Sequence, residues 1–240
     1  MRLGEQQRHL KPTHARLVRD ITLIMVCCSL ACACTQADAS PWAVIATADG
    51  ITVEARAQPR SDRLTYKASG TLPGGLYDVL AVLDDIDGYV NWADHCAVSV
   101  EVETLSPYDR VLYYRRAVPW PFRDRDALLR MNVRVSTTGK WATVRYQPEL
   151  NTPFPTLPRF VRVQHILGVY ELTELSADTT HVSYVLDIDL DGAMPAWLAR
   201  RFARDLPRSA IHRLRAQVIT TKASGEYSEF VRTHQQVDGT

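Results

Sequence analysis

Two adjacent arginines, Arg115 and Arg116, lie in a stretch whose composition predicts a β-strand. Because side chains alternate between the two faces of a strand, we expect one guanidinium group to point into the protein. A buried guanidinium needs a carboxylate partner or an anionic group of a ligand, such as a phosphate. The pair therefore predicts a polar contact inside the protein, made either with the chain itself or with the head group of a ligand.

His165 is a second candidate for chemistry, because the pattern around it predicts that its imidazole points into an apolar interior. The apolar residues in phase with it are Val161, Val163, Leu167 and Val169. An unpartnered polar group in such a place costs a few kcal/mol. The imidazole is therefore expected either to be hydrogen-bonded within the core or to contact a hydroxyl or carbonyl group of a ligand.

The familiar catalytic and metal-binding motifs are absent from the sequence after the first 39 residues. There is no G-x-S-x-G nucleophile elbow, no H-E-x-x-H, no C-x-x-C and no phosphate-binding glycine loop. Asp187, Asp189 and Asp191 resemble the start of a calcium loop, but the twelfth position, which should carry a carboxylate, is Leu198. We expect no catalytic residue, no metal and no cofactor, which favours a binding protein over an enzyme.

The N-terminal 39 residues differ from the rest of the chain. Residues 1–20 carry five basic side chains, and residues 21–33 form an uncharged apolar run of 13 residues. This run is shorter than the about 20 residues that span a bilayer, but it suits the core of a signal peptide. Ala37-Asp38-Ala39 has the form of a cleavage site. We expect residues 1–39 to be a signal peptide or leader and the protein to be exported, as a periplasmic or secreted protein.

Two alternatives to soluble export stay open: retention of the segment as a membrane anchor, and lipidation of Cys32 or Cys34. Neither cysteine has the usual leucine three residues before it. Beyond the leader only Cys96 remains, so no internal disulfide is possible, and 23 basic residues face 24 acidic ones. A neutral body argues against a nucleic-acid partner, whose phosphates require a basic surface.

The hydrophobic period changes twice along the chain and predicts an α+β fold. Apolar residues follow helical spacing within residues 75–90, alternate within residues 96–190, and return to helical spacing within residues 194–218. The middle region predicts a curved antiparallel sheet of about seven strands. The last region predicts a long helix, kinked or rewound at Pro207, that covers the concave face of the sheet. Large apolar faces on both leave room for an internal cavity.

The body of the chain opens with a segment from Pro41 to Thr47 that predicts a turn or short helix. Strands are expected at residues 51–57 and 64–69. No repeat or linker follows, so we expect one domain at residues 40–225 and a tail at residues 226–240.

The segment Pro119-Trp120-Pro121, followed by Arg125-Asp126, predicts the end of one strand and the start of the next. Proline fixes φ and has no N–H, so it does not belong inside a central strand. We expect Trp120 to plug the end of the sheet, and Arg125 and Asp126 to bond with backbone there and hold the turn.

This arrangement resembles the START family, the lipid-transfer domains related to steroidogenic acute regulatory protein. Further segments resemble the family in the same order along the chain. They are Trp42 with Asp49-Gly50-Ile51 and Val53, then Tyr66 to Gly70, then Tyr89-Val90-Asn91-Trp92, and finally Gly192 to Leu198.

The resemblance implies a helix-grip fold, in which a curved antiparallel β-sheet wraps around a long C-terminal α-helix and encloses a hydrophobic cavity. It implies that one lipid or sterol-like molecule is bound, and transferred, without catalysis. The proline-rich loop at residues 147–159 is a candidate gate. Because the wider superfamily includes polyketide aromatase/cyclases, a cyclase-like enzyme is an alternative, with His165, Arg115 or Tyr113 as general acid or base. A lipid sensor with a small or filled cavity is the third possibility.

The expected ligand contacts are apolar, aromatic or polar residues of the predicted strands and helices. They are Tyr89, Trp92, Tyr113, Arg115, Arg116, Leu129, Met131, His165, Leu167, Tyr184, Leu186, Trp197 and Leu198. The last helix also carries seven basic residues up to Lys222 against Asp205 alone. This face is expected either to be simply solvated or to touch an anionic membrane transiently during lipid pickup.

Overall fold

The computed structural model of the protein describes residues 41–58, 63–190, 192 and 194–237. The expected leader, residues 1–39, lies outside the described residues. The described strands are β1 Ala43–Ala48, β2 Ile51–Ala57, β3 Leu64–Pro73, β4 Cys96–Ser106, β5 Asp109–Arg116, β6 Arg125–Val135, β7 Trp141–Pro148, β8 Val161–Arg162, β9 His165–Ser176 and β10 Thr179–Asp189. The described helices are α2 Leu76–Asp84, α3 Tyr89–Trp92, α4 Ala196–Ser224 and α5 Ser228–Val237.

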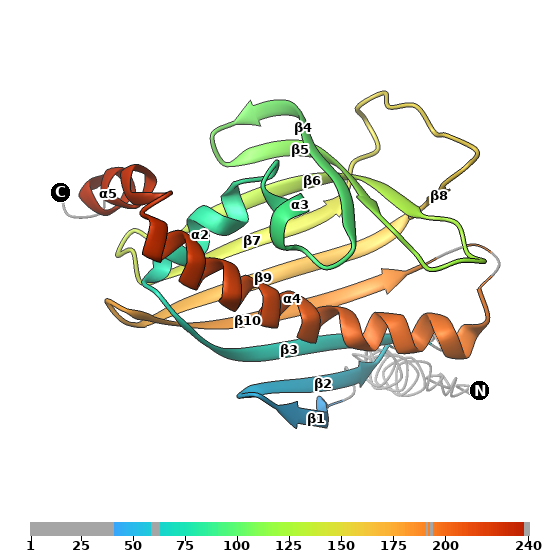
Figure 1. Ribbon diagram of the computed structural model, residues 1–240, viewed down its shortest axis with the longest axis horizontal. Helices are drawn as coiled ribbons and strands as arrows, with labels where there is room; N and C mark the ends of the chain where they lie inside the picture. The colour runs from blue at the N-terminus through green and yellow to red at the C-terminus, as the bar shows by residue number, and fades with distance from the viewer. Residues whose placement is uncertain (1–40, 59–62, 191, 193, 238–240) are drawn as a thin grey trace, which may run out of the picture. The chain divides into compact units, whose positions relative to one another are not determined.

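The strands form one ten-stranded sheet in the order β1-β2-β3-β10-β9-β7-β6-β5-β4, with β8 beside β6. Every neighbouring pair is antiparallel except β6 and β8. The helix α4 crosses one face of the curved sheet, and α2 and α3 lie beside it on the same face (Figure 1). The expected α+β helix-grip architecture is therefore confirmed.

The sheet begins with a strand where a turn or short helix was expected. The segment Ala43–Ala48 is β1, and it pairs with β2 through a tight turn at Asp49 and Gly50. Both turn residues have positive φ, 55° and 69°. This is the requirement of a type I′ hairpin, which Asp-Gly satisfies because glycine carries no Cβ. Because β1 pairs with β2 alone among the described strands, it is an edge strand of the sheet.

The alternation expected around residue 165 is shifted by one position. The alternation expected from Val161 to Val169 requires one continuous strand, but the chain breaks between β8 and β9. The break means that His165 no longer shares the phase of Val161. The inner face of β9 carries Ile166, Gly168, Tyr170 and Leu172, whereas His165, Leu167 and Val169 lie on the outer face.

The valines of β4 are also less buried than the expected alternation implied. Ser99 is 7% exposed, whereas Val100 is 41% exposed. The pairing of β4 with β5 has three register shifts, which are typical of bulges and change the face on which a side chain lies. By contrast, β6 follows its pattern, because Leu129, Met131 and Val133 are all buried.

Trp120 does not plug the sheet. Its side chain is 91% exposed, because β5 already ends at Arg116 and the proline turn projects beyond the paired strands. Arg125 and Asp126 are buried and structural. Arg125 Nε donates to the Leu190 carbonyl over 3.1 Å. The Asp126 carboxylate accepts two hydrogen bonds, of 3.1 and 2.9 Å, from Arg162 of β8.

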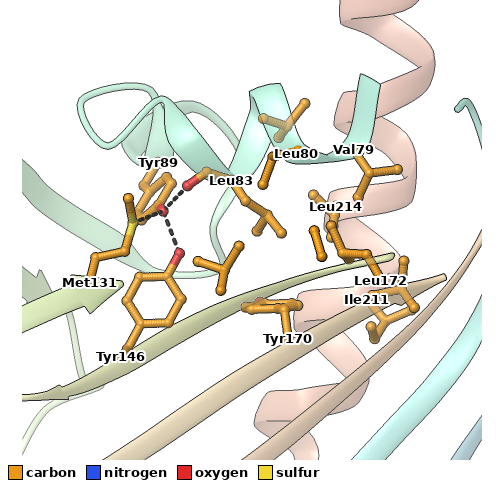
Figure 2. Close-up of a cluster of buried hydrophobic side chains, with 14 of the residues drawn as sticks. Val79, Leu80, Leu83, Tyr89, Met131, Tyr146, Tyr170, Leu172, Ile211 and Leu214 are labelled. Carbon is orange, nitrogen blue, oxygen red and sulfur yellow. Dashed lines mark hydrogen bonds between the residues drawn. The ribbon is translucent and has the colours of Figure 1, made fainter. Parts of the chain in front are cut away.

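The long helix α4 runs without interruption through Pro207. Its C-terminal half is packed tightly, because Ile211, Leu214 and Val218 have no exposed surface. Ile211 and Leu214 meet α2 and the inner face of the sheet (Figure 2), and Val218 belongs to the same buried cluster. A further helix, α5, occupies residues 228–237, where a tail was expected, and Tyr227 just before it donates a 2.6 Å hydrogen bond to Asp85.

Candidate functional site

A cavity of about 150 Å³ lies between the inner face of the sheet, α3 and the middle of α4. Strands β5, β6, β7, β9 and β10 supply its floor, and Leu206 and Ala210 of α4 supply part of its roof. Its apolar lining includes Leu112, Leu129 and Ile166. An apolar concave site with a few polar groups is the usual form of a small-molecule binding site.

Tyrosines dominate the lining of this cavity. Five of the ten tyrosines of the chain contribute to it, from five different elements. They are Tyr89 of α3, Tyr114 of β5, Tyr146 of β7, Tyr170 of β9 and Tyr184 of β10. Each strand tyrosine occupies an inward position of its strand, so the sheet register brings the four of them onto one face.

The first pair of hydroxyls is bonded within the protein. The Tyr89 hydroxyl lies 2.6 Å from that of Tyr146, and it donates to the backbone carbonyl of Leu83 (Figure 2). The Met131 sulfur is 3.7 Å from the same oxygen. Burial raises the pKa of both tyrosines far above the ordinary value, so both are neutral at pH 7.

The second pair is stacked. The rings of Tyr170 and Tyr184, which face each other in the ladder between β9 and β10, lie 4.0 Å apart with an interplanar angle of 11°. Gly168 makes this possible, because a Cβ there would lie 3.0 Å from the Tyr184 hydroxyl and 3.3 Å from its ring. Burial raises the pKa of both hydroxyls, so they also remain neutral.

An ion pair forms the polar end of the cavity, where Arg116 and Asp94 are each 19% exposed. The Asp94 carboxylate is 3.2 Å from Nη2 of Arg116 on β5 and 3.0 Å from Nη2 of Arg213 on α4. Burial acts to raise the pKa of Asp94, but the hydrogen bond with Ser209 and the nearby cations outweigh it and lower the pKa. Asp94 thus ties α4 to the sheet.

The model of the START domain family matches residues 49–223, which include every residue of this cavity. This chain belongs to the START domain family. An uncharacterized protein of Pseudomonas aeruginosa is 24% identical to it over 178 residues, which are 74% of this chain and 87% of that protein. The expected family membership is confirmed.

Two solved structures illustrate how the START fold is shared. A STAR-related lipid transfer protein of Xanthomonas axonopodis is 24% identical, with 74% of this chain and 98% of that chain covered and a TM-score of 0.67. Human StAR-related lipid transfer protein 5 is 16% identical, with coverages of 87% and 97% and a TM-score of 0.66. At these identities the likeness concerns the fold.

The START cavity contains six of the expected ligand contacts. They are Tyr89, Trp92, Arg116, Leu129, Tyr184 and Leu186. Met131 is fully buried and does not line the cavity, and its sulfur lies 3.7 Å from the Tyr89 hydroxyl. Whether these residues contact a ligand stays a prediction, but the fold brings them to one place.

Four expected contacts lie on the outer face of the sheet instead. Tyr113 stacks on Phe154, with 4.8 Å between ring centroids. The Arg115 guanidinium lies 4.9 Å from the ring of Phe160. His165 pairs with Asp187 over 2.9 Å, and Leu167 is half-buried on the same face. As expected, one arginine of the pair faces inward: Arg116 lines the cavity and pairs with the Asp94 carboxylate of the chain itself.

The remaining two expected contacts lie at the start of α4. Trp197 is 66% exposed, and neither it nor Leu198 lines the cavity. The residues of α4 that line the cavity are Leu206 and Ala210. The sequence reasoning missed Tyr114, Tyr146 and Tyr170. The strand pattern contained a signal for Tyr146. It lies two residues after the apolar Val144, and residues two apart in a strand share a face, so both point inward.

Two further possibilities concern the described residues alone. No helix among them is both long and apolar enough to cross a bilayer. Within the same residues, no group of three or more histidine, cysteine, aspartate or glutamate side chains is arranged to hold a metal ion.

The Asp94 ion pair predicts a specific pH dependence of stability. Because the folded pKa of Asp94 is lowered, its contribution is present above the unfolded pKa of about 3.9 and is lost as the pH falls through the folded value. We expect Asp94→Asn to reduce the free energy of unfolding at pH 7 by on the order of 1 kcal/mol. The difference from wild type should shrink below about pH 4. Urea unfolding over a pH series measures both.

Asp205→Asn is the matched control. Asp205 also forms an ion pair with an arginine, but its partner is the neighbouring Arg204 and both side chains are exposed. We expect little change in stability from this variant at any pH. A difference between wild type and Asp94→Asn that stayed constant from neutral pH to pH 3 would show that the ionised pair does not stabilise the fold.

Proposed function

We propose that this START domain binds one hydrophobic ligand in the tyrosine-lined cavity and transfers it between membranes without catalysing a reaction. The observation that carries the proposal is the apolar and aromatic cavity between the sheet and α4. Membership of the START family supports it, and the two structural relatives described above are named as lipid transfer proteins. Hydrophobic burial provides the driving force for uptake.

The size of the cavity requires part of its wall to move. Its volume of about 150 Å³ is below the roughly 300–1,000 Å³ of ordinary ligand pockets. The stretch of α4 before Pro207 is the part of the wall that yields most easily. Pro207 donates no backbone hydrogen bond to Ala203, and Leu206 is only half-buried. The proline-rich loop contributes no lining residue, so passage beside α4 is favoured over a gate at residues 147–159.

The positions of the polar groups support a noncatalytic role. His165, Arg115 and Tyr113, the general acid or base candidates of a cyclase-like enzyme, all lie on the outer face of the sheet. Within the cavity, Arg116 and Asp94 are paired with each other. The raised tyrosine pKa values leave the hydroxyls neutral at pH 7, so they are poor proton acceptors from a substrate.

Filling the cavity should abolish transfer. We expect Ala210→Phe to place a ring in the cavity and to reduce ligand transfer at least about tenfold, the effect of losing 1.4 kcal/mol of binding. The measurement is transfer of dehydroergosterol, pyrene-labelled phosphatidylcholine and a pyrene-labelled fatty acid between vesicles. Ala216→Phe makes the same change on the exposed side of α4 and should transfer at the wild-type rate.

Circular dichroism and thermal melting are the controls that test whether both variants are folded. If folded Ala210→Phe transferred every probe at the wild-type rate, the ligand would have to bind outside this cavity.

Two exposed tryptophans support a transient membrane contact at one end of α4. Trp120, in the proline turn, is 91% exposed, and Trp197, in the first turn of α4, is 66% exposed. A small cavity of about 30 Å³ is lined by Pro119 on one side and by Met194 and Phe202 on the other, so the two segments flank one another. Exposed tryptophans are favoured at membrane interfaces.

Five of the seven basic residues of α4 fall into two contrasting groups. Arg208, Arg213 and Lys222 pair with Asp49, Asp94 and Asp178, so they brace the helix against the sheet and the turn after β9. Arg200 and Arg201, beside Trp197, are exposed, and no ion pair of either is found within the described residues. We therefore place the transient membrane contact at the N-terminal end of α4 and the proline turn. The braced residues belong to the solvated and structural part of the helix.

The double variant Trp120→Ala/Trp197→Ala tests this contact. We expect it to bind vesicles of phosphatidylglycerol and phosphatidylcholine at least about tenfold more weakly than wild type, because each indole contributes roughly 1.5 kcal/mol or more when buried. Co-sedimentation measures the binding. Trp141→Ala, at the start of β7, is the control, since Trp141 is also exposed, at 47%. Equal losses from the control and the double variant would contradict the assignment.

Export is the remaining proposal, and its support is the sequence of residues 1–39. We expect the protein recovered from its host to begin at Ser40, as determined by N-terminal sequencing. A chain that begins at Cys32 or Cys34 with attached lipid would establish the lipoprotein alternative. An uncleaved chain in the membrane fraction would establish a retained anchor.

A further inference from the structure

The five cavity tyrosines form a polar path across an otherwise apolar site. Tyr146, Tyr170 and Tyr184 come from β7, β9 and β10, which are successive strands of the sheet. Tyr146 meets Tyr170 edge-on, with ring centroids 6.2 Å apart, and Tyr170 stacks on Tyr184. Tyr89 closes one end of the path, and Tyr114 lies toward Arg116 at the other.

The hydroxyls along this path are not equally satisfied. Tyr89 and Tyr146 bond to each other and to the Leu83 carbonyl, and the Tyr114 hydroxyl interacts with the Cys96 thiol. Tyr170 and Tyr184 make no hydrogen bond with any described residue, although Tyr170 is only 5% exposed. Both residues line the cavity, so a ligand that displaces water and brings no hydrogen-bonding group would leave their hydroxyls unpaired, which is unfavourable. A molecule that enters this cavity is therefore favoured if it brings oxygen to these two positions.

This requirement discriminates between classes of hydrophobic ligand. An acyl chain has no hydrogen-bonding group along its length, so it would leave both hydroxyls unsatisfied. Its head group would need a cation, but Arg116, the cation of the described lining, is already bound to Asp94. A ring compound that carries a hydroxyl or keto oxygen supplies the missing partner and packs against the aromatic walls. It also suits a cavity of about 150 Å³ better than a long chain does.

We propose that the ligand of this cavity is a compact ring compound bearing a hydroxyl or keto oxygen, and that Tyr170 and Tyr184 bind that oxygen. The inference rests on the proposed function, because it names the ligand class of the same cavity. Gly168 takes part by leaving the space in which the Tyr184 hydroxyl lies. Fused aromatic alcohols and sterols share this chemistry.

The test compares 2-naphthol with naphthalene, which differ by one hydroxyl group. Isothermal titration calorimetry measures the binding of each to wild type, Tyr170→Phe and Tyr184→Phe. We expect wild type to bind 2-naphthol more tightly than naphthalene. Each variant should lose about two- to tenfold in affinity for 2-naphthol, the value of one hydrogen bond, and keep its affinity for naphthalene. Tyr113→Phe removes a hydroxyl from the outer face and should change neither.

Competition with dehydroergosterol and with oleate completes the design. Displacement of 2-naphthol by dehydroergosterol that weakens in Tyr184→Phe supports the inference with a sterol as ligand. Tyrosine-dependent 2-naphthol binding without sterol competition supports it with an aromatic compound. Equal affinities for 2-naphthol and naphthalene, or oleate binding that dominates and is unchanged in both variants, overturn the inference and leave the proposed function intact. If none of the four probes binds wild type, the inference is overturned, and the proposed function fails as well only if the vesicle assay also detects no transfer of phosphatidylcholine.

Discussion

The structure depends on one packing constraint: α4, with only the short helices α2 and α3 beside it among the described helices, must cover the concave face of a sheet much wider than itself. The C-terminal half of α4 meets this constraint completely, since Ile211, Leu214 and Val218 are fully buried together with the apolar face of α2. The middle of the helix does not fill the space beneath it. The cavity is the result, and it lies where tight packing ends at Pro207.

Polar groups then have to be accommodated inside an apolar site, and each solution has a structural consequence. Asp94 satisfies Arg116 and Arg213 at once, so the same carboxylate neutralises the inner arginine of β5 and fastens α4. The Tyr89 and Tyr146 hydroxyls satisfy each other and bind α3 to the sheet. These bonds stabilise the frame of the cavity, because breaking one would leave a buried polar group unpaired. The Tyr170 and Tyr184 hydroxyls take no part in these bonds, and both residues line the cavity.

Sequence reasoning predicted the architecture well because hydrophobic period is a property of whole segments. It predicted β6 and the inward arginine for the same reason. It was wrong at His165, where a two-residue break between β8 and β9 changed which side chains of β9 face inward. It was also wrong at β4, where bulges exchanged Ser99 and Val100, and at Trp120, which lies beyond the last paired residue of β5. Bulges and strand ends depend on neighbouring strands, so a linear pattern does not reveal them.

The same contrast between whole segments and single positions separates the shared fold from the chemistry of the cavity. The family likeness of 16–24% identity in structural relatives is sufficient for the sheet and helix to form. The cavity chemistry depends on few inward positions on separate strands, such as Gly168, Tyr170 and Tyr184. Exchanging one inward side chain for another of similar size leaves strand pairing unchanged, because the backbone makes the ladder bonds. Ligand selectivity in this scaffold can therefore change by single substitutions without loss of the fold.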